Sequence, residues 1–142
     1  MESINHFQWD KNKVSLLQKN SKLWEVKRAK IEVIIISDVI NGDNDTTIFT
    51  IVDSDYKLYH LDILGLRRGD FELVYNFFRE FYDIDRLEKN FRDTSIVFYP
   101  EELRGIFPYN KSILTWVIRS FHNAGGGKLN KRIKNYIALK NN

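Results

Sequence analysis

The sequence contains no cysteine, only two prolines and one methionine among its 142 residues. The lack of cysteine excludes disulfide frameworks, thiolate metal sites and cysteine nucleophiles. Long apolar runs are also missing, because the longest aliphatic stretch, at residues 33–36, is far short of the roughly 20 residues of a membrane-spanning helix. The N-terminal segment lacks the apolar core of a signal peptide. We therefore expect a soluble, cytoplasmic protein with no membrane partner.

Apolar and aromatic residues are plentiful by contrast. They make up 43% and 14% of the chain, which is enough to build a hydrophobic core. No internal repeat, low-complexity segment or linker rich in proline and serine divides the chain. A length of 142 residues fits one domain. The expectation is a single domain over residues 1–142.

Charge is unevenly distributed, although the net charge is only +3. Residues 11–30 carry seven basic side chains against the single acid Glu25. Residues 128–142 carry five basic side chains and no acid, whereas residues 38–62 carry six aspartates and one lysine. Basic ends thus flank an acidic centre. Such asymmetry is found in proteins that contact a charged partner, and also on ordinary solvated surfaces.

Alternation of apolar and polar side chains predicts three strands. Ala29, Ile31, Val33 and Ile35 point to one side of the first strand, and turn-forming residues follow at 41–45. The expected strands are at residues 27–36, 47–53 and 56–63. Their short connections predict an antiparallel meander.

Helical spacing predicts most of the remaining elements. Asp70 is placed to cap a helix whose apolar stripe begins at Phe71 and ends at Tyr82. Further helices are expected at residues 11–20, after Asp83, at residues 113–121 and from residue 129, and a fourth strand at residues 95–99. The order is α-β-β-β-α-α-β-α-α. This order predicts an α+β fold with a three- to four-stranded antiparallel meander and helices packed mainly on one face.

Three of the seven glycines stand together at residues 125–127. They do not form a Walker phosphate loop, because His122 replaces its first glycine and Leu129 replaces its final Ser or Thr. Gly125 is better suited to end one helix and link it to a basic C-terminal helix. The start of that helix is a candidate anion or nucleic-acid site, formed by Lys128, Lys131, Arg132 and Lys134.

The sequence Asp55-Tyr56-Lys57 matches a D/E-x-K motif, with Asp53, Asp43 or Asp38 as an earlier carboxylate. Together with the expected order of elements over residues 11–100, it resembles the core of PD-(D/E)xK nucleases. That resemblance implies a Mg²⁺ site and catalytic roles for Asp53, Asp55 and Lys57. The chain departs from the family pattern, because Asp55 lies in a turn and no Pro-Asp pair precedes it.

No histidine spacing typical of a zinc site and no nucleophile motif is present. We therefore expect a non-enzymatic protein without a cofactor or metal, which binds one dedicated protein partner. Small bacterial α+β inhibitors, such as immunity proteins that neutralise a toxin, are of this general type. The expected contact residues, facing a basic partner such as a toxin domain, are Asp43, Asp45, Asp53 and Asp55. The alternative is a nucleic-acid-binding protein or a degenerate metal-dependent nuclease.

Overall fold

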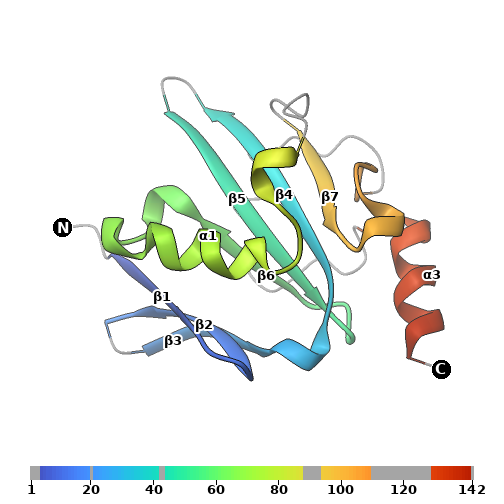
Figure 1. The fold of residues 1–142 in the computed structure, drawn as a ribbon, viewed down its shortest axis with the longest axis horizontal. Helices are drawn as coiled ribbons and strands as arrows, with labels where there is room; N and C mark the ends of the chain where they lie inside the picture. The colour runs from blue at the N-terminus through green and yellow to red at the C-terminus, as the bar shows by residue number, and fades with distance from the viewer. Residues whose placement is uncertain (1–3, 20, 42–43, 88–93, 110–128, 142) are drawn as a thin grey trace.

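The fold of the chain is given by a computed structural model (Figure 1). The structure describes residues 4–19, 21–41, 44–87, 94–109 and 129–141. Within them lie seven strands in two antiparallel sheets and two α-helices. The α+β class and the single domain are as expected, but the described chain begins with strands and not with a helix. No helix among these residues is long and apolar enough to cross a membrane.

The first sheet, sheet A, is made entirely from the N-terminal part of the chain. Its strands are β1 (Asn5–Trp9), β2 (Lys13–Gln18) and β3 (Ser21–Lys27), in the order β1-β2-β3. The predicted helix at 11–20 is therefore wrong. Val14 and Leu16 are both buried, at 0% and 3% exposure, and are two positions apart, which is the period of a strand. Pairing with β1 and β3 outweighs the weak helical spacing of Val14 and Leu17.

The second sheet, sheet B, contains the predicted meander and one further strand. Its strands are β4 (Ile31–Asn41), β5 (Asn44–Asp53), β6 (Leu58–Asp62) and β7 (Ser95–Tyr99), in the order β6-β5-β4-β7. The meander and the fourth strand are confirmed. The β4–β5 hairpin closes with Asn41 opposite Asn44, as the turn-forming residues predict. A short 3-10 turn, η1 (Arg28–Lys30), replaces the expected start of the first strand.

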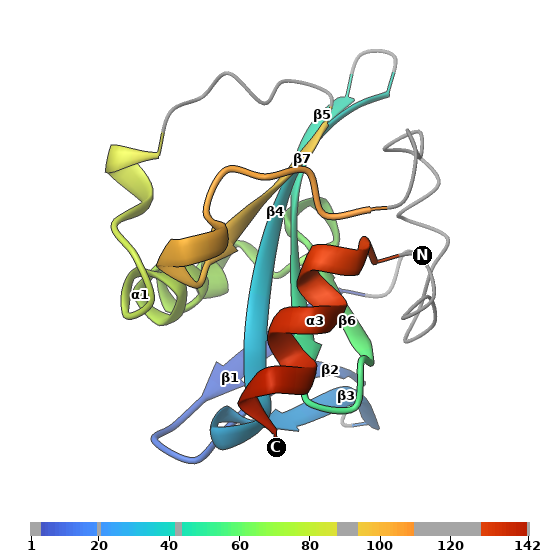
Figure 2. The ribbon, with the colours of Figure 1, turned by 90° about the vertical axis from the view of Figure 1, so that its right-hand side faces the viewer.

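Both faces of sheet B are covered, so the expectation of helices mainly on one face is wrong. Helix α1 (Phe71–Arg79) and sheet A pack on one face, in a core that includes Ile34, Phe49 and Phe78. Helix α3 (Lys131–Lys140) packs on the other face, where Ile133 and Ile137 are fully buried. Figure 2 shows α3 lying across this second face, with sheet A at the far end of the molecule. The reason is that β4 and β5 are apolar on both sides, so each side needs a covering layer.

Short 3-10 turns connect the main elements. They are η2 (Ile63–Gly65), η3 (Arg68–Asp70), η4 (Ile84–Arg86) and η5 (Glu101–Leu103). The Asp83 side chain accepts a hydrogen bond from the Asp85 N–H, so it caps a turn as expected, although the turn is 3-10. The last predicted helix is confirmed as α3. The predicted helix at 113–121 and the glycine run at 125–127 lie outside the described residues.

Asp70 connects sheet A to α1 instead of capping the helix with its side chain. Its carboxylate is 1% exposed and accepts hydrogen bonds from the Phe7 N–H at 2.9 Å and the Arg67 guanidinium at 2.7 Å. The Arg67 N–H in turn donates to the Asn5 carbonyl at 2.8 Å. These bonds satisfy two outward backbone groups of β1 and join sheet A to the start of α1.

Candidate binding surface

The outer face of sheet A is the side that points away from the core. Rows of side chains cross it in register, one of them formed by Gln8, Ser15 and Glu25. Phe7, Val14 and Leu16 are buried on the opposite side, because neighbouring residues of a strand point to opposite faces. No other described element lies beyond sheet A at the lower edge of Figure 1, so this face is open within the described chain. Its charged side chains are Lys13, Lys22, Glu25 and Lys27.

The outer face of sheet A is basic. Its three strands carry three lysines and one glutamate, a net charge of +2, and the whole segment at residues 4–30 carries seven Lys and Arg against two acids, a net charge of +5. The whole chain has a net charge of +3, so the remaining residues together carry −2. The modest overall charge therefore conceals a positive sheet on a slightly negative body. This concentration of charge is the property of sheet A that bears on binding.

Glu25 is the one acidic residue in the three strands of sheet A, and its surroundings hold it in the ionised form. Its carboxylate accepts a hydrogen bond from the Ser15 hydroxyl at 2.9 Å and lies 3.1 Å from Lys22 and 3.4 Å from Lys13. The Ser15 hydrogen bond, followed by the Lys22 contact, lowers the pKa of Glu25 below its ordinary value. The Glu25 carboxylate thus lies between Lys13 and Lys22, and the face keeps a net positive charge.

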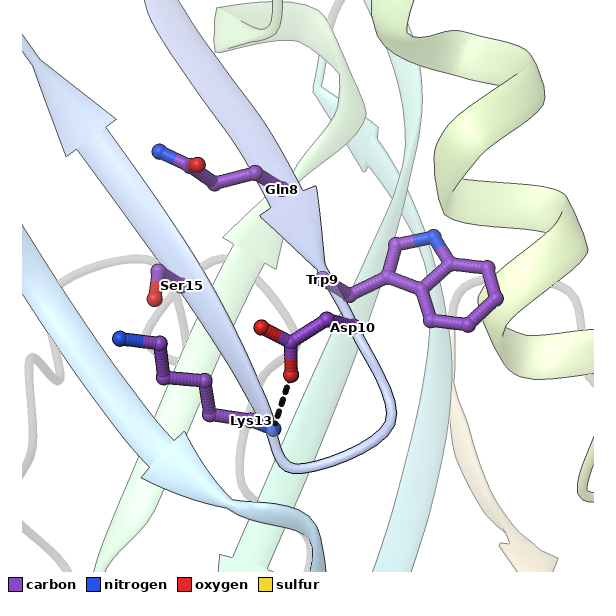
Figure 3. A pocket seen from close by; sticks show the side chains of 5 residues that line it. All are labelled: Gln8, Trp9, Asp10, Lys13 and Ser15. Atoms are coloured by element: carbon purple, nitrogen blue, oxygen red, sulfur yellow. Dashed lines mark hydrogen bonds between the residues drawn. The ribbon is translucent and has the colours of Figure 1, made fainter.

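A shallow hollow lies at the β1–β2 end of the same face (Figure 3). It is lined by Gln8, Trp9, Asp10, Lys13 and Ser15 and has a volume of about 50 Å³. Ligand pockets usually enclose about 300–1,000 Å³, so this hollow is too small for a substrate. The indole of Trp9 points away from it toward α1 and donates to the Leu73 carbonyl at 2.9 Å. The hollow is a shallow polar depression in the surface and does not have the size of a catalytic pocket.

Asp10 shapes the turn beside this hollow. Its carboxylate accepts hydrogen bonds from the N–H groups of Asn12 at 2.7 Å and Lys13 at 3.0 Å. These two bonds lower the pKa of Asp10. Local side-chain-to-backbone bonding of this kind is the usual role of Asp in a tight turn.

Of the four aspartates predicted to form one acidic patch, the three that the structure describes do not form a common exposed surface. Asp43 lies outside the described residues. Asp45 is exposed near the start of β5 and Asp53 is at its end, about 26 Å away at about 3.3 Å per residue. Asp55 is exposed in the β5–β6 turn and pairs with Lys30 at 3.6 Å. The described members therefore do not form a continuous acidic surface.

Asp53 is occupied inside the β5–β6 turn. It is 3% exposed; one carboxylate oxygen accepts the N–H groups of Asp55 and Lys57, and the other accepts the Tyr59 hydroxyl at 2.7 Å. These bonds support a turn in which Tyr56 has the unusual φ of 66°. Burial, followed by the hydrogen bond to Asp53, raises the pKa of Tyr59. The geometry is that of a structural turn, with Lys57 exposed to solvent.

The Mg²⁺ site implied by the nuclease resemblance is not assembled in the part of the chain that the structure describes. Within those residues no three His, Asp or Glu side chains converge as metal ligands would. The three catalytic residues of that alternative share one turn, but Asp53 faces backbone N–H groups and Asp55 faces Lys30. The resemblance also depends on a first helix at 11–20, where the structure has β2.

The basic residues of the C-terminal helix are at the start of α3. Lys131 and Arg132 are exposed in its first turn, Lys134 is half-buried, and Lys128 lies outside the described residues. The Asn130 side chain caps the helix by accepting the Ile133 N–H at 2.9 Å. The helix start is thus already satisfied in part by its own capping residue.

Polar side chains on the α3 face of sheet B are paired with one another across neighbouring strands. The Ser37 and Ser95 hydroxyls are 2.7 Å apart, and the Thr50 hydroxyl is 2.7 Å from Nδ1 of His60. Ser37 and Thr50 are both 0% exposed. Such cross-strand pairs stabilise a buried sheet, so this row has a structural explanation.

Sequence reasoning identified the basic segment at 11–30 but missed that it forms an open sheet. The alternation of Phe7, Trp9, Val14, Leu16, Trp24 and Val26 was the available signal. Comparison with models of known protein families, with curated proteins and with solved structures finds no match for this chain.

Proposed function

We propose that the protein is a non-enzymatic binding domain that recognises one dedicated protein partner through the outer face of sheet A. The observation that carries this proposal is the concentration of charge: +5 over residues 4–30 against −2 over the rest of the chain. A surface of this kind speeds association with a partner of opposite charge and selects against partners of the same charge. The proposed partner surface is therefore acidic. This differs from the basic partner that was expected on the basis of Asp43, Asp45, Asp53 and Asp55.

An acidic protein is favoured over nucleic acid by the residues on this face. Sheets that bind single-stranded nucleic acid present aromatic rings on which bases stack. Here Phe7 and Trp24 are buried, and Trp9 turns toward α1. An inhibitor that covers a partner, as immunity proteins do, needs only such a surface and no catalytic group.

Charge reversal tests the proposal. The probe is a fluorescent poly-glutamate of about 20 residues, whose binding is measured by anisotropy at low and at physiological salt. We expect the wild type to bind and the double variant Lys13→Glu/Lys27→Glu to lose at least about tenfold in affinity, because about 1.4 kcal/mol is enough for that change. The matched control, Lys131→Glu/Arg132→Glu, changes the same number of charges on α3 and should bind as the wild type does.

Three outcomes contradict the proposal. One is no binding of poly-glutamate by the wild type at low salt. Another is an equal loss in both double variants, which would indicate an effect of net charge alone. The third is tighter binding of a DNA or RNA duplex of equal charge that is lost in the Lys131/Arg132 variant, which would favour the nucleic-acid alternative.

A further inference from the structure

Three of the four sheet edges in the described chain accept or donate hydrogen bonds to other parts of the chain. On β1 the Phe7 N–H is bound by Asp70 and the Asn5 carbonyl by the Arg67 N–H. On β7 the Val97 N–H and carbonyl are bound by the backbone of residues 105–106. On β6 the His60 carbonyl accepts the Trp24 indole N–H at 3.0 Å. Each of these bonds occupies a backbone group with which an added strand would pair.

On the edge of β3 the described residues form no such hydrogen bond. The Arg28 N–H donates to the Asn12 carbonyl, which makes 12 and 28 a hydrogen-bonded pair. Because such pairs alternate along an antiparallel ladder, the backbone groups of Val26 face β2, and those of Glu25 and Lys27 face outward. No hydrogen bond within the described chain satisfies these outward groups of Glu25 and Lys27.

We propose that an acidic extended segment of the protein partner pairs with β3 and becomes the fourth strand of sheet A. This inference rests on the proposed function and specifies its binding mode. The side chains of Glu25 and Lys27 lie on the outer face, in the same part of the sheet as Lys22 and Lys13. A residue opposite them on an added strand would be about 5 Å away, within reach of an ion pair.

The rest of β3 also suits a peptide strand. A bulge between Leu16 and Leu17 interrupts the pairing of β2 with β3, and regular pairing runs only from Trp24 to Lys27 of β3. The regular edge is short, so the added strand is short as well. Leu23, at the bulge, is 43% exposed and offers an apolar contact beside the basic residues. Backbone hydrogen bonds then supply affinity, while alternating side chains supply specificity.

A second copy of the chain is a weaker candidate for this edge. Two copies would bring together two sheets with a net charge of +2 each, within the roughly 8 Å over which charges interact at physiological salt. Glu25, the one acid that could attract a Lys27 of the other copy, already contacts Lys13 and Lys22. An acidic segment meets neither obstacle.

The peptide arm of the test separates strand pairing from simple charge attraction. Two labelled peptides of about ten residues are compared, one alternating Glu and Val, the other alternating Glu and Pro. They carry the same charge, but proline lacks the N–H that a ladder needs. We expect the Glu-Val peptide to bind at least about fivefold more tightly. Equal binding overturns the strand proposal and leaves the charged surface intact, whereas no binding of either peptide overturns both.

The protein arm removes one backbone N–H. Lys27 has a φ of −73°, which proline can adopt, and its N–H points outward. Lys27→Pro and Lys27→Ala lose the same charge, and only the first loses the donor. We expect Lys27→Pro to bind the Glu-Val peptide about fivefold more weakly than Lys27→Ala, the equivalent of one hydrogen bond of about 1 kcal/mol. If Lys27→Pro and Lys27→Ala both melt at the wild-type temperature and bind the Glu-Val peptide with equal affinity, the proposal is overturned.

Amide exchange gives a direct readout. In the free protein the amides of Glu25 and Lys27 should exchange fast and that of Val26 slowly, and the Glu-Val peptide should slow the first two. No slowing at saturating peptide overturns the proposal. Light scattering of the protein alone tests whether a second copy of the chain pairs with β3. A dimer that dissociates in the Lys27→Pro variant would assign this edge to a second copy and would overturn the proposal of a peptide partner.

Discussion

Lys13 and Lys27 lie directly opposite each other on β2 and β3, with both side chains exposed on the outer face of sheet A. Like charges at directly opposite positions of a sheet destabilise it by a few tenths of a kcal/mol or more. Glu25 relieves part of this repulsion through Lys13, while Lys27 has no ion-pair partner among the described residues. The Lys13–Lys27 pair therefore lowers the stability of sheet A.

Neutralising this pair should increase stability. For Lys13→Gln/Lys27→Gln we expect the free energy of unfolding in urea to rise by about 0.2–0.5 kcal/mol at low salt, and less at high salt, because salt screens exposed charges. Lys57→Gln is the control, since Lys57 is exposed in the β5–β6 turn. A loss of stability in the double variant at low salt would show that the two lysines are not in repulsion.

The Ser15–Glu25 hydrogen bond predicts a pH dependence. The folded-state pKa of Glu25 is lowered, first by Ser15 and then by Lys22, so its stabilising contribution is present above the unfolded-state pKa near 4.5. The contribution is lost as the pH falls through the lower folded-state pKa. In Ser15→Ala we expect the Glu25 pKa, measured by NMR titration of its carboxyl carbon, to rise toward 4.5. An unchanged pKa would assign the shift to the lysines.

Much of sheet B was predictable because its signals are local. Turn-forming residues at 41–45 and the alternation on either side specify a hairpin without reference to the rest of the chain. Residues 95–99 are short and apolar, and their pairing with β4 was the one non-local step. Ile34 and Ile36 make the second face of β4 apolar as well, but nothing local specifies which element covers it.

Sheet A and its outer face could not be predicted in the same way. The segment at 11–20 fits either period weakly, and long-range pairing with β1 decides between them. The aspartates form a cluster in the sequence, but β5 separates Asp45 from Asp53 and the turn buries Asp53. Each residue of a strand adds about 3.3 Å of length, so residues that are close in the sequence can lie far apart on the surface.

Asp70 should be the most sensitive polar residue in the described chain. Asp70→Asn keeps the shape but loses the charge and turns an amide donor toward either Phe7 or Arg67. We expect a loss of about 2–4 kcal/mol in the free energy of unfolding, because one partner of a buried, charge-assisted contact is removed. Asp83→Asn is the matched control: Asp83 is 49% exposed and the expected loss is below about 0.5 kcal/mol. Similar losses in the two variants would contradict this role for Asp70.

The Asp53–Tyr59 contact predicts a structural role for the β5–β6 turn. Tyr59→Phe removes the hydroxyl donor and leaves one oxygen of the Asp53 carboxylate without it, so we expect a loss of about 1–2 kcal/mol in urea unfolding. In the wild type the raised pKa of Tyr59 means that its contribution persists below pH 10 and is lost above it. Absorbance titration of the phenol measures this shift. A Tyr59 that ionises at its ordinary pKa would show that the contact is weak in solution.

Arg28 joins sheet A to α1 at the point where the chain passes into sheet B. Its guanidinium lies 5.6 Å from the ring centre of Trp9 and 5.3 Å from that of Phe77, and it donates to the Glu80 carboxylate at 2.6 Å. A planar guanidinium can stack on rings and bind a carboxylate together, whereas an ammonium group cannot do both in the same geometry. The position of the basic sheet relative to the body therefore depends on an arginine here.

Arg28→Lys should lower the free energy of unfolding by about 1–2 kcal/mol and shift the Trp fluorescence maximum to the red, because Trp9 loses its cover. Arg79→Lys is the matched control. Arg79 also lies over a ring, Tyr75 at 5.9 Å, but sits on the exposed side of α1, and the expected change is within about 0.5 kcal/mol. Since Lys keeps the positive charge, a large loss for Arg28 alone isolates stacking and hydrogen-bond geometry. Equal small changes in both variants would mean that sheet A is held by its apolar contacts and Asp70 without help from Arg28.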